Sequence, residues 1–108
     1  MKMENNQVLQ QLNACVAVCN ICFEECLCME NVSMLTRCIE LVRDSAEACQ
    51  LAASALARDS ELVDSFLKLA AETCQACAAE CVKHEHIHCR RCAEVCTHCV
   101  EMCQAHVG

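Results

Sequence analysis

Apolar and sulfur-bearing residues recur at steps of three or four along most of this chain, and polar residues fill the positions between them. Residues with that spacing lie on one face of an α-helix. The pattern is broken by polar stretches near residues 30–33, 58–60 and 83–88. We therefore expect four helices, over residues 4–29, 34–57, 61–83 and 85–106.

The breaks also carry residues that are typical of turns. Asn31 and Ser33 are candidates for the turn and N-cap before the second helix, and Asp59 or Ser60 is expected to cap the third. The chain has no proline, and its one glycine is the last residue, so nothing interrupts the helices. Four helices of similar length with short turns predict an all-α fold, an antiparallel up-down-up-down four-helix bundle. Its length suits a single domain, residues 1–108.

Net charge and composition restrict the partners. The chain carries a net charge of −7, has no basic patch and contains only two aromatic residues of the Phe, Trp and Tyr type, so we expect no nucleic-acid partner. No run of 18 apolar residues predicts a membrane span, and we expect no membrane partner. The polar N-terminal segment lacks the apolar region of a secretory signal, which favours the cytoplasm.

Cysteine changes the picture most, because it supplies 15 of the 108 residues. Cys28 lies two residues past Cys26, points away from the stripe, and is expected to be a surface thiol or to lie at a frayed helix end. The other fourteen fall on the predicted inward stripes and are the candidate metal ligands: Cys15, Cys19, Cys22, Cys26, Cys38, Cys49, Cys74, Cys77, Cys81, Cys89, Cys92, Cys96, Cys99 and Cys103.

Disulfides explain these thiols poorly. A reducing cytosol disfavours them, and an odd number of cysteines does not suit a closed disulfide framework. Side chains three or four residues apart on a helix have Cβ atoms roughly 5–6 Å apart, whereas a disulfide needs about 3.8 Å. The repeated CxxC and CxxxC spacings therefore favour metal binding over covalent pairing.

Folding the chain at its turns separates sulfur from hydrocarbon. Most of the cysteines fall in the half that holds the first and third turns, while Cys49, Cys99 and Cys103 reach toward the opposite half. We expect that opposite half to be a plug of aliphatic and aromatic side chains that stabilises the fold even without metal. Its predicted members are Val8, Leu9, Leu12, Leu51, Leu56, Leu62, Val63, Phe66 and Leu67.

Straight helices without glycine or proline favour Cu(I) as the metal. Zinc sites and iron–sulfur clusters typically use cysteines on loops, whereas Cu(I) is soft, takes two or three thiolates and accepts bridging sulfur. If each sulfur is shared by one or two ions, the stripes would hold roughly 7–15 Cu(I). This predicts multiple Cu(I) ions in a store that is not an enzyme. A broader zinc or cadmium store and a thiol–disulfide redox protein are the alternatives.

Histidines and methionines gather at the sulfur-rich end. His84 and His88 continue cysteine stripes and are further candidate ligands, where ions would first be caught. Met29 and Met34 also continue stripes, but they are more readily explained as gap-filling side chains. His98 lies off the stripe and is expected to face solvent.

The repeated CxxxC pairs resemble those of a known family. The pairs at residues 15–19, 22–26, 77–81, 92–96 and 99–103 are similar to those of the cytosolic four-helix-bundle copper storage proteins. That resemblance implies cysteines that line the bundle and bind many Cu(I) ions, histidines near an open end, and a homotetramer. The expected partners are copper ions and either a copper chaperone or a low-molecular-weight thiol.

Overall fold

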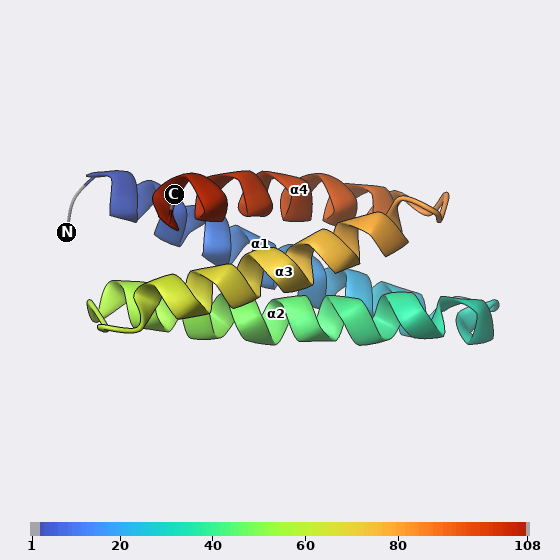
Figure 1. Ribbon diagram of the computed structural model, residues 1–108. Coiled ribbons are helices and arrows are strands. Elements are labelled where there is room, and N and C mark those ends of the chain that lie inside the picture. Colours follow the sequence, from blue (N-terminus) through green and yellow to red (C-terminus); the bar gives the residue numbers. More distant parts are fainter. Residues whose placement is uncertain (1–2, 108) are drawn as a thin grey trace.

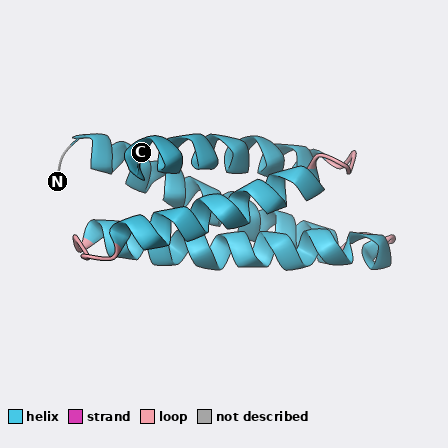
Figure 2. Ribbon diagram, viewed as in Figure 1, coloured by secondary structure: helices cyan, strands magenta, loops and turns pink. Residues whose placement is uncertain are grey.

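Four α-helices run alternately up and down in a computed structural model that describes residues 3–107 (Figure 1). No strand occurs within that described range (Figure 2). The predicted antiparallel four-helix bundle is therefore confirmed. The helices are α1 (Met3–Leu27), α2 (Thr36–Ala57), α3 (Val63–Cys81) and α4 (Ile87–Val107), and a short 3₁₀ helix, η1 (Val32–Leu35), precedes α2.

The alternating direction of the helices places two connections at one end of the bundle and one connection with both chain ends at the other. Each helix packs against its two neighbours in the cyclic order α1, α2, α3, α4, and the principal extents are 44 × 18 × 18 Å. The turn between α1 and α2 and the loop between α3 and α4 lie at one end, on the right in Figure 1, and we call this the histidine end. The start of α1, the end of α4 and the turn between α2 and α3 lie at the other, which we call the plug end.

Helix ends lie within two or three residues of the predicted positions. Helix α1 ends at Leu27 rather than at residue 29, because the amides of Cys28 and Met29 bond to carbonyls only three residues back. Asn31 does precede a helical segment, but its side chain makes no capping hydrogen bond. The segment it precedes is the 3₁₀ helix, so α2 begins at Thr36 instead of residue 34.

The turn between α2 and α3 also departs from the predicted cap. Leu62, not Asp59 or Ser60, occupies the N-cap position of α3. Ser60 Oγ instead accepts a hydrogen bond from the Leu62 amide at 3.1 Å. Asp59 adopts a left-handed conformation with φ 57°, which aspartate tolerates better than most residues, and this reverses the chain without glycine.

The plug end contains most of the buried aliphatic side chains, although Leu35 and Val42 are buried toward the histidine end. Leu12 and Leu67 are fully buried, Val8 and Leu56 nearly so, and Leu9, Val63 and Phe66 are partly buried against them. Two predicted members are wrong: Leu51 and Leu62 are 51% and 54% exposed. Leu51 lies on the outer face of α2 and Leu62 lies in the turn before α3, so neither reaches the interior.

Alanine lines much of the inner side of α2. Its buried alanines have small side chains that let neighbouring backbones approach closely: Ala46, Ala48, Ala52, Ala53 and Ala55. No helix in the described part of the chain is long and apolar enough to cross a membrane.

Candidate metal centre

A continuous column of thiols occupies the bundle axis. Fourteen of the fifteen cysteines are buried, and they are the fourteen that the sequence placed on inward stripes. Every one of these fourteen sulfurs lies within 4.0 Å of at least one other. We call this set the sulfur column. Its arrangement follows from helical repeats of three and four residues on three of the helices and of eleven residues, about three turns, on α2.

All fifteen cysteines are free thiols. The shortest separation in the column, 3.4 Å between the sulfurs of Cys49 and Cys74, far exceeds the S–S bond length of about 2.05 Å. Within α1, α3 and α4, sulfurs four residues apart lie 3.8–4.0 Å from one another, as they do for Cys15 and Cys19 or Cys22 and Cys26. The column is therefore a reduced array of potential ligands.

Nearest the plug, one cysteine from each helix contributes to a four-thiol group. The sulfurs of Cys15, Cys49, Cys74 and Cys99 all lie within 4.8 Å of one another. Cys15 and Cys74 are 3.6 Å apart, and Cys49 and Cys99 are 3.9 Å apart. Cys103 adjoins this plug-side group, 4.0 Å from Cys99. The group holds four thiols in a small volume without bending any helix.

A second group lies in the middle of the column. It comprises Cys19, Cys77, Cys92 and Cys96, again with all sulfurs within 4.8 Å of one another. Helix α2 adds no thiol to this group, whereas α4 adds two. Cys96 lies 3.8 Å from Cys15, which belongs to the plug-side group. The two groups are therefore contiguous, and a sulfur at their border can serve both.

Two groups that share Cys22 lie toward the histidine end. One contains Cys22, Cys38 and Cys81, with 3.5 Å between the last two. The other contains Cys22, Cys26, Cys89 and His88, and the Nε2 atom of His88 lies 3.5 Å from the sulfur of Cys26. His88 is thus the predicted histidine whose ring reaches the sulfur column.

His84 is held differently, by a carboxylate that the sequence analysis did not single out. Its Nε2 atom lies 2.9 Å from Oε2 of Glu80, which is buried in the last turn of α3. Lys83 and Arg37 approach the other oxygen of Glu80 at 3.5 and 3.4 Å. The spacings of three and four residues from Glu80 to Lys83 and His84 were the available signal. Arg37 comes from α2, and only the tertiary structure brings it there.

Burial and mutual contact shape the proton affinity of this site. Burial raises the pKa of the Cys26 and Cys89 thiols, and the nearby Cys22 thiol raises it further in both. Between adjacent thiols, the hydrogen bond from Cys19 lowers the pKa of Cys15, and the same contact raises the pKa of Cys19. One thiolate thus disfavours ionisation of its neighbours, so only a few of the column thiols can be ionised at the same time without a bound cation. A cation that displaces the protons removes this repulsion.

The ring of His88 is predisposed to the neutral form. Burial lowers its pKa below the ordinary value, and the neighbouring His86, whose ring stacks on it at 5.3 Å, lowers it further. The Glu80 carboxyl also has a lowered pKa, because the hydrogen bond to His84 and the charge of Lys83 outweigh the effect of burial. A neutral imidazole keeps a lone pair free for a metal ion.

The residues predicted to lie outside the column do so. Cys28 is exposed, and its sulfur lies 3.9 Å from Oε1 of Glu24. His98 is exposed, as expected. Met29 packs against the core, whereas Met34 is 76% exposed and contributes little packing.

Comparison with known proteins identifies this arrangement. A family model described as "Copper storage protein" matches residues 1–108, the whole chain. The chain belongs to the copper storage protein family. It is 41% identical to the uncharacterized cysteine-rich protein YhjQ of Bacillus subtilis (strain 168) over 91 residues. These aligned residues make up 84% of each of the two chains.

Solved structures of copper storage proteins share the fold closely. The Cu(I)-bound copper storage protein BsCsp3 is 35% identical, with a TM-score of 0.94 over 98% of this chain and all of that one. A cytosolic copper storage protein from Streptomyces lividans, solved with five coppers, is 32% identical, with a TM-score of 0.93 over 96% of this chain and 92% of that one.

The sulfur spacing of this family member fits thiolate-bound metal. With a metal–sulfur bond of about 2.3 Å, three sulfurs around one ion lie about 4.0 Å apart and four lie about 3.8 Å apart. The observed contacts of 3.4–4.0 Å require only small side-chain adjustments to meet either geometry. Because Cys22 belongs to two groups and Cys15 contacts sulfurs of two, the column favours a metal that accepts bridging thiolates.

Proposed function

We propose that this chain stores multiple Cu(I) ions as thiolate clusters along the axis of its four-helix bundle. The observation that carries the proposal is the sulfur column itself, fourteen buried free thiols in contiguous groups. Membership of the copper storage protein family supports it. The fourteen column cysteines and His88 are the proposed ligands, and His84 is a further candidate that would have to leave Glu80 in order to bind.

Shared sulfurs favour Cu(I) over zinc. Cu(I) is stable with two or three thiolates and accepts bridging sulfur, whereas a structural zinc ion takes four ligands in a closed tetrahedron. Isolated tetrahedra would divide the column into a few separate sites. Overlapping groups allow most sulfurs to serve two ions, so the number of Cu(I) ions should approach the number of thiols.

Anaerobic titration of the reduced protein with Cu(I) against a strong chelator tests this proposal. We expect cooperative filling to a total of roughly 7–15 Cu(I) per chain, because each sulfur is shared by one or two ions. A parallel titration with Zn²⁺ serves as the control. Saturation at one to four Cu(I), or a clear preference for zinc, contradicts copper storage.

Uptake should also weaken as the pH falls. Thiols must lose their protons to bind metal, so protons compete directly with Cu(I). Burial raises the pKa of the Cys26 and Cys89 thiols, which strengthens this competition at the histidine end. Chelator competition at several pH values measures the effect, and an affinity that is independent of pH argues against thiolate ligands.

The same proposal includes a cytoplasmic location, a storage role without catalysis, and a homotetramer. The Streptomyces lividans relative is described as cytosolic, and the tetramer is implied by the resemblance to its family. Exposed Ile21, Leu69 and Val82 offer apolar surface for subunit contacts. Light scattering of the copper-free and copper-loaded protein measures the mass. A monomer in both states contradicts the tetramer and leaves the storage proposal intact.

A copper chaperone or a low-molecular-weight thiol is the proposed source or acceptor of the ions.

A further inference from the structure

The sulfur column ends on the plug side at Cys103, a buried thiol that lines a surface cavity. Cys103 lies on α4, 4.0 Å from Cys99, and has no other sulfur partner in the described part of the chain. It is also the only column cysteine with measurable exposure, 1% against 0% for the other thirteen. Cys103 is therefore the terminal thiol of the column on the plug side.

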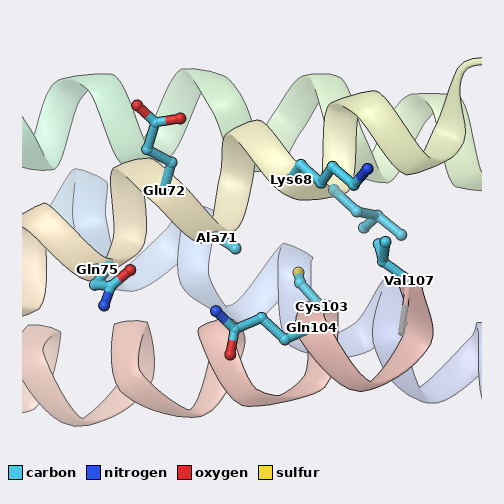
Figure 3. Close-up of a pocket in the computed structure, with 8 residues that line it drawn as sticks. Lys68, Ala71, Glu72, Gln75, Cys103, Gln104 and Val107 are labelled. Atoms are coloured by element: carbon cyan, nitrogen blue, oxygen red, sulfur yellow. The ribbon is translucent and has the colours of Figure 1, made fainter.

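A cavity between α3 and α4 opens directly onto this thiol. Figure 3 shows Cys103 and Gln104 of α4 facing Ala71 and Gln75 of α3 across it. The volume is about 330 Å³. That lies at the lower end of the ~300–1,000 Å³ typical of ligand pockets, so a small molecule fits better than a drug-sized one. The lining residues are Leu67, Lys68, Ala71, Glu72, Gln75, Cys103, Gln104 and Val107.

The residues that line the cavity include one basic and one acidic side chain. Lys68 supplies an ammonium group and Glu72 a carboxylate on adjacent turns of α3, while Gln75 and Gln104 supply amides. Alkyl groups of Leu67, Ala71 and Val107 form the apolar part of the wall. A ligand that carries a carboxylate, an ammonium group and a short apolar stem complements these groups.

The column links this cavity to the histidine end through sulfur alone. From Cys103 the contacts pass through Cys99, Cys49 and Cys74 to Cys15 at separations of 3.4–4.0 Å. They continue through Cys96, Cys92 and Cys77 to Cys81 at 3.8–3.9 Å. A soft ion can pass between neighbouring thiolates by exchanging one sulfur for the next. Cys22 lies within 4.8 Å of Cys81 and connects this path to Cys26, Cys89 and His88, so ions from the histidine end can reach Cys103.

We propose that the cavity is a docking site for a small zwitterionic thiol that exchanges Cu(I) with Cys103. The proposal rests on the storage function above. The incoming thiol gives up its proton as its sulfur bonds to the Cu(I) on Cys103. The bond from that copper to the Cys103 sulfur then breaks, and Sγ takes up the proton. Copper stays Cu(I) throughout, and no oxidant or reductant is needed. The cavity thus gives the store an exit that does not pass through the histidine end.

Release kinetics test the proposal with glutathione as the probe. The fully loaded protein is mixed anaerobically with excess bicinchoninate, with or without glutathione, and formation of the Cu(I)–bicinchoninate complex is followed. The difference between the two rates is the thiol-dependent release. Neutral 2-mercaptoethanol serves as a second thiol that lacks the charges recognised by Lys68 and Glu72.

Two variants test the cavity in different ways, one by filling its volume and the other by reversing a charge in its lining. Ala71→Leu fills it, and should slow thiol-dependent release by either thiol several-fold. Lys68→Glu, at an exposed position that tolerates substitution, should slow release by glutathione several-fold while release by 2-mercaptoethanol stays at the wild-type rate. Matched controls are Ala79→Leu, an exposed alanine on the same helix outside this cavity, and Arg58→Glu in the α2–α3 turn. Both controls should release copper at wild-type rates.

Each outcome decides between the proposals. If Lys68→Glu and Ala71→Leu load like wild type and release copper at wild-type rates with both thiols, the docking site is wrong and the store stands. If Ala71→Leu does not fold, Lys68→Glu alone decides, by the presence or absence of a difference between glutathione and 2-mercaptoethanol. If the wild-type chain holds no more than a few Cu(I), the storage function fails and the docking proposal falls with it.

Discussion

Two cysteines only two residues apart, at the C-terminal end of α1, have opposite environments. Cys26 is fully buried in the sulfur column, whereas Cys28 is exposed beyond the last residue of the helix. A step of two residues turns a side chain by more than half of a helical turn, so the two thiols cannot share a face. Their contrast shows that position relative to the helical repeat, and not residue type, decides which thiols are candidate ligands.

Serine substitution at these two positions should separate ligand from bystander. Cys28→Ser should leave the number of bound Cu(I) unchanged, because its sulfur contacts no other sulfur in the described residues. Cys26→Ser should lower that number by at least one, because it removes a sulfur that lies 3.5 Å from His88 and 4.0 Å from Cys89. Chelator-competed titration gives both numbers. Equal capacities in the two variants contradict the assignment of the column.

The two candidate histidines should also differ. His88→Ala should slow the first phase of Cu(I) uptake several-fold, because its neutral ring lies beside Cys26 at the end of the column. His84→Ala should affect uptake less, because the Glu80 carboxylate already engages its ring. Stopped-flow mixing with a Cu(I) donor complex measures both rates. A larger effect of His84→Ala contradicts this order and places the entry ligand on the other ring.

At the scale of the elements, α1, α2 and α3 each carry a buried stripe with hydrocarbon side chains toward the plug end and sulfur beyond them. In α3, for instance, Leu67 and Ala70 precede Cys74 and Cys77 on the buried face. Antiparallel packing aligns these three hydrocarbon segments at the plug end, where α4 adds the partly buried Val107. The plug contributes hydrophobic stability that does not depend on metal.

Truncation of a plug leucine should therefore destabilise the copper-free protein. Leu67→Ala should cost ~2–5 kcal/mol of unfolding free energy, because Leu67 is fully buried and alanine leaves a cavity. Leu62→Ala is the matched control and should cost far less, because Leu62 is largely exposed in the turn before α3. Chemical denaturation of the copper-free variants measures both. Similar losses at the two positions contradict the division between plug and surface.

At the scale of the whole molecule, the bundle is a rod whose interior is mainly hydrocarbon at one end and mainly sulfur along the rest, where Leu35 and Val42 are also buried. Neutral thiols are small and weakly polar, so they pack like apolar groups while protonated. Copper-free protein should accordingly be folded at neutral pH, with a helical circular dichroism spectrum. A random-coil spectrum after copper removal contradicts this expectation.

The same thiol interior should lower the stability of the copper-free fold at alkaline pH. The pKa values of Cys26 and Cys89 are raised in the folded state, so the unfolded chain releases their protons first as the pH rises past the ordinary thiol value of 9.0. Their contribution to stability is full below that pH and is lost above it. The melting temperature of copper-free protein should stay nearly constant up to about pH 8 and should fall as the pH rises past about 9. Copper-loaded protein, already deprotonated at these thiols, is the control and should change less.

The sequence by itself determined the helices, their inward faces and the set of fourteen column thiols, because a repeat of three to four residues specifies one side of a helix without reference to any partner. It erred where local geometry competes with pattern, as at the cap of α3 and at Leu51 and Leu62. Only the tertiary structure decided which thiols share a group, that Glu80 holds His84 with help from Arg37, and that Cys103 borders a cavity. Those features depend on the relative height and rotation of packed helices, which no single stripe encodes.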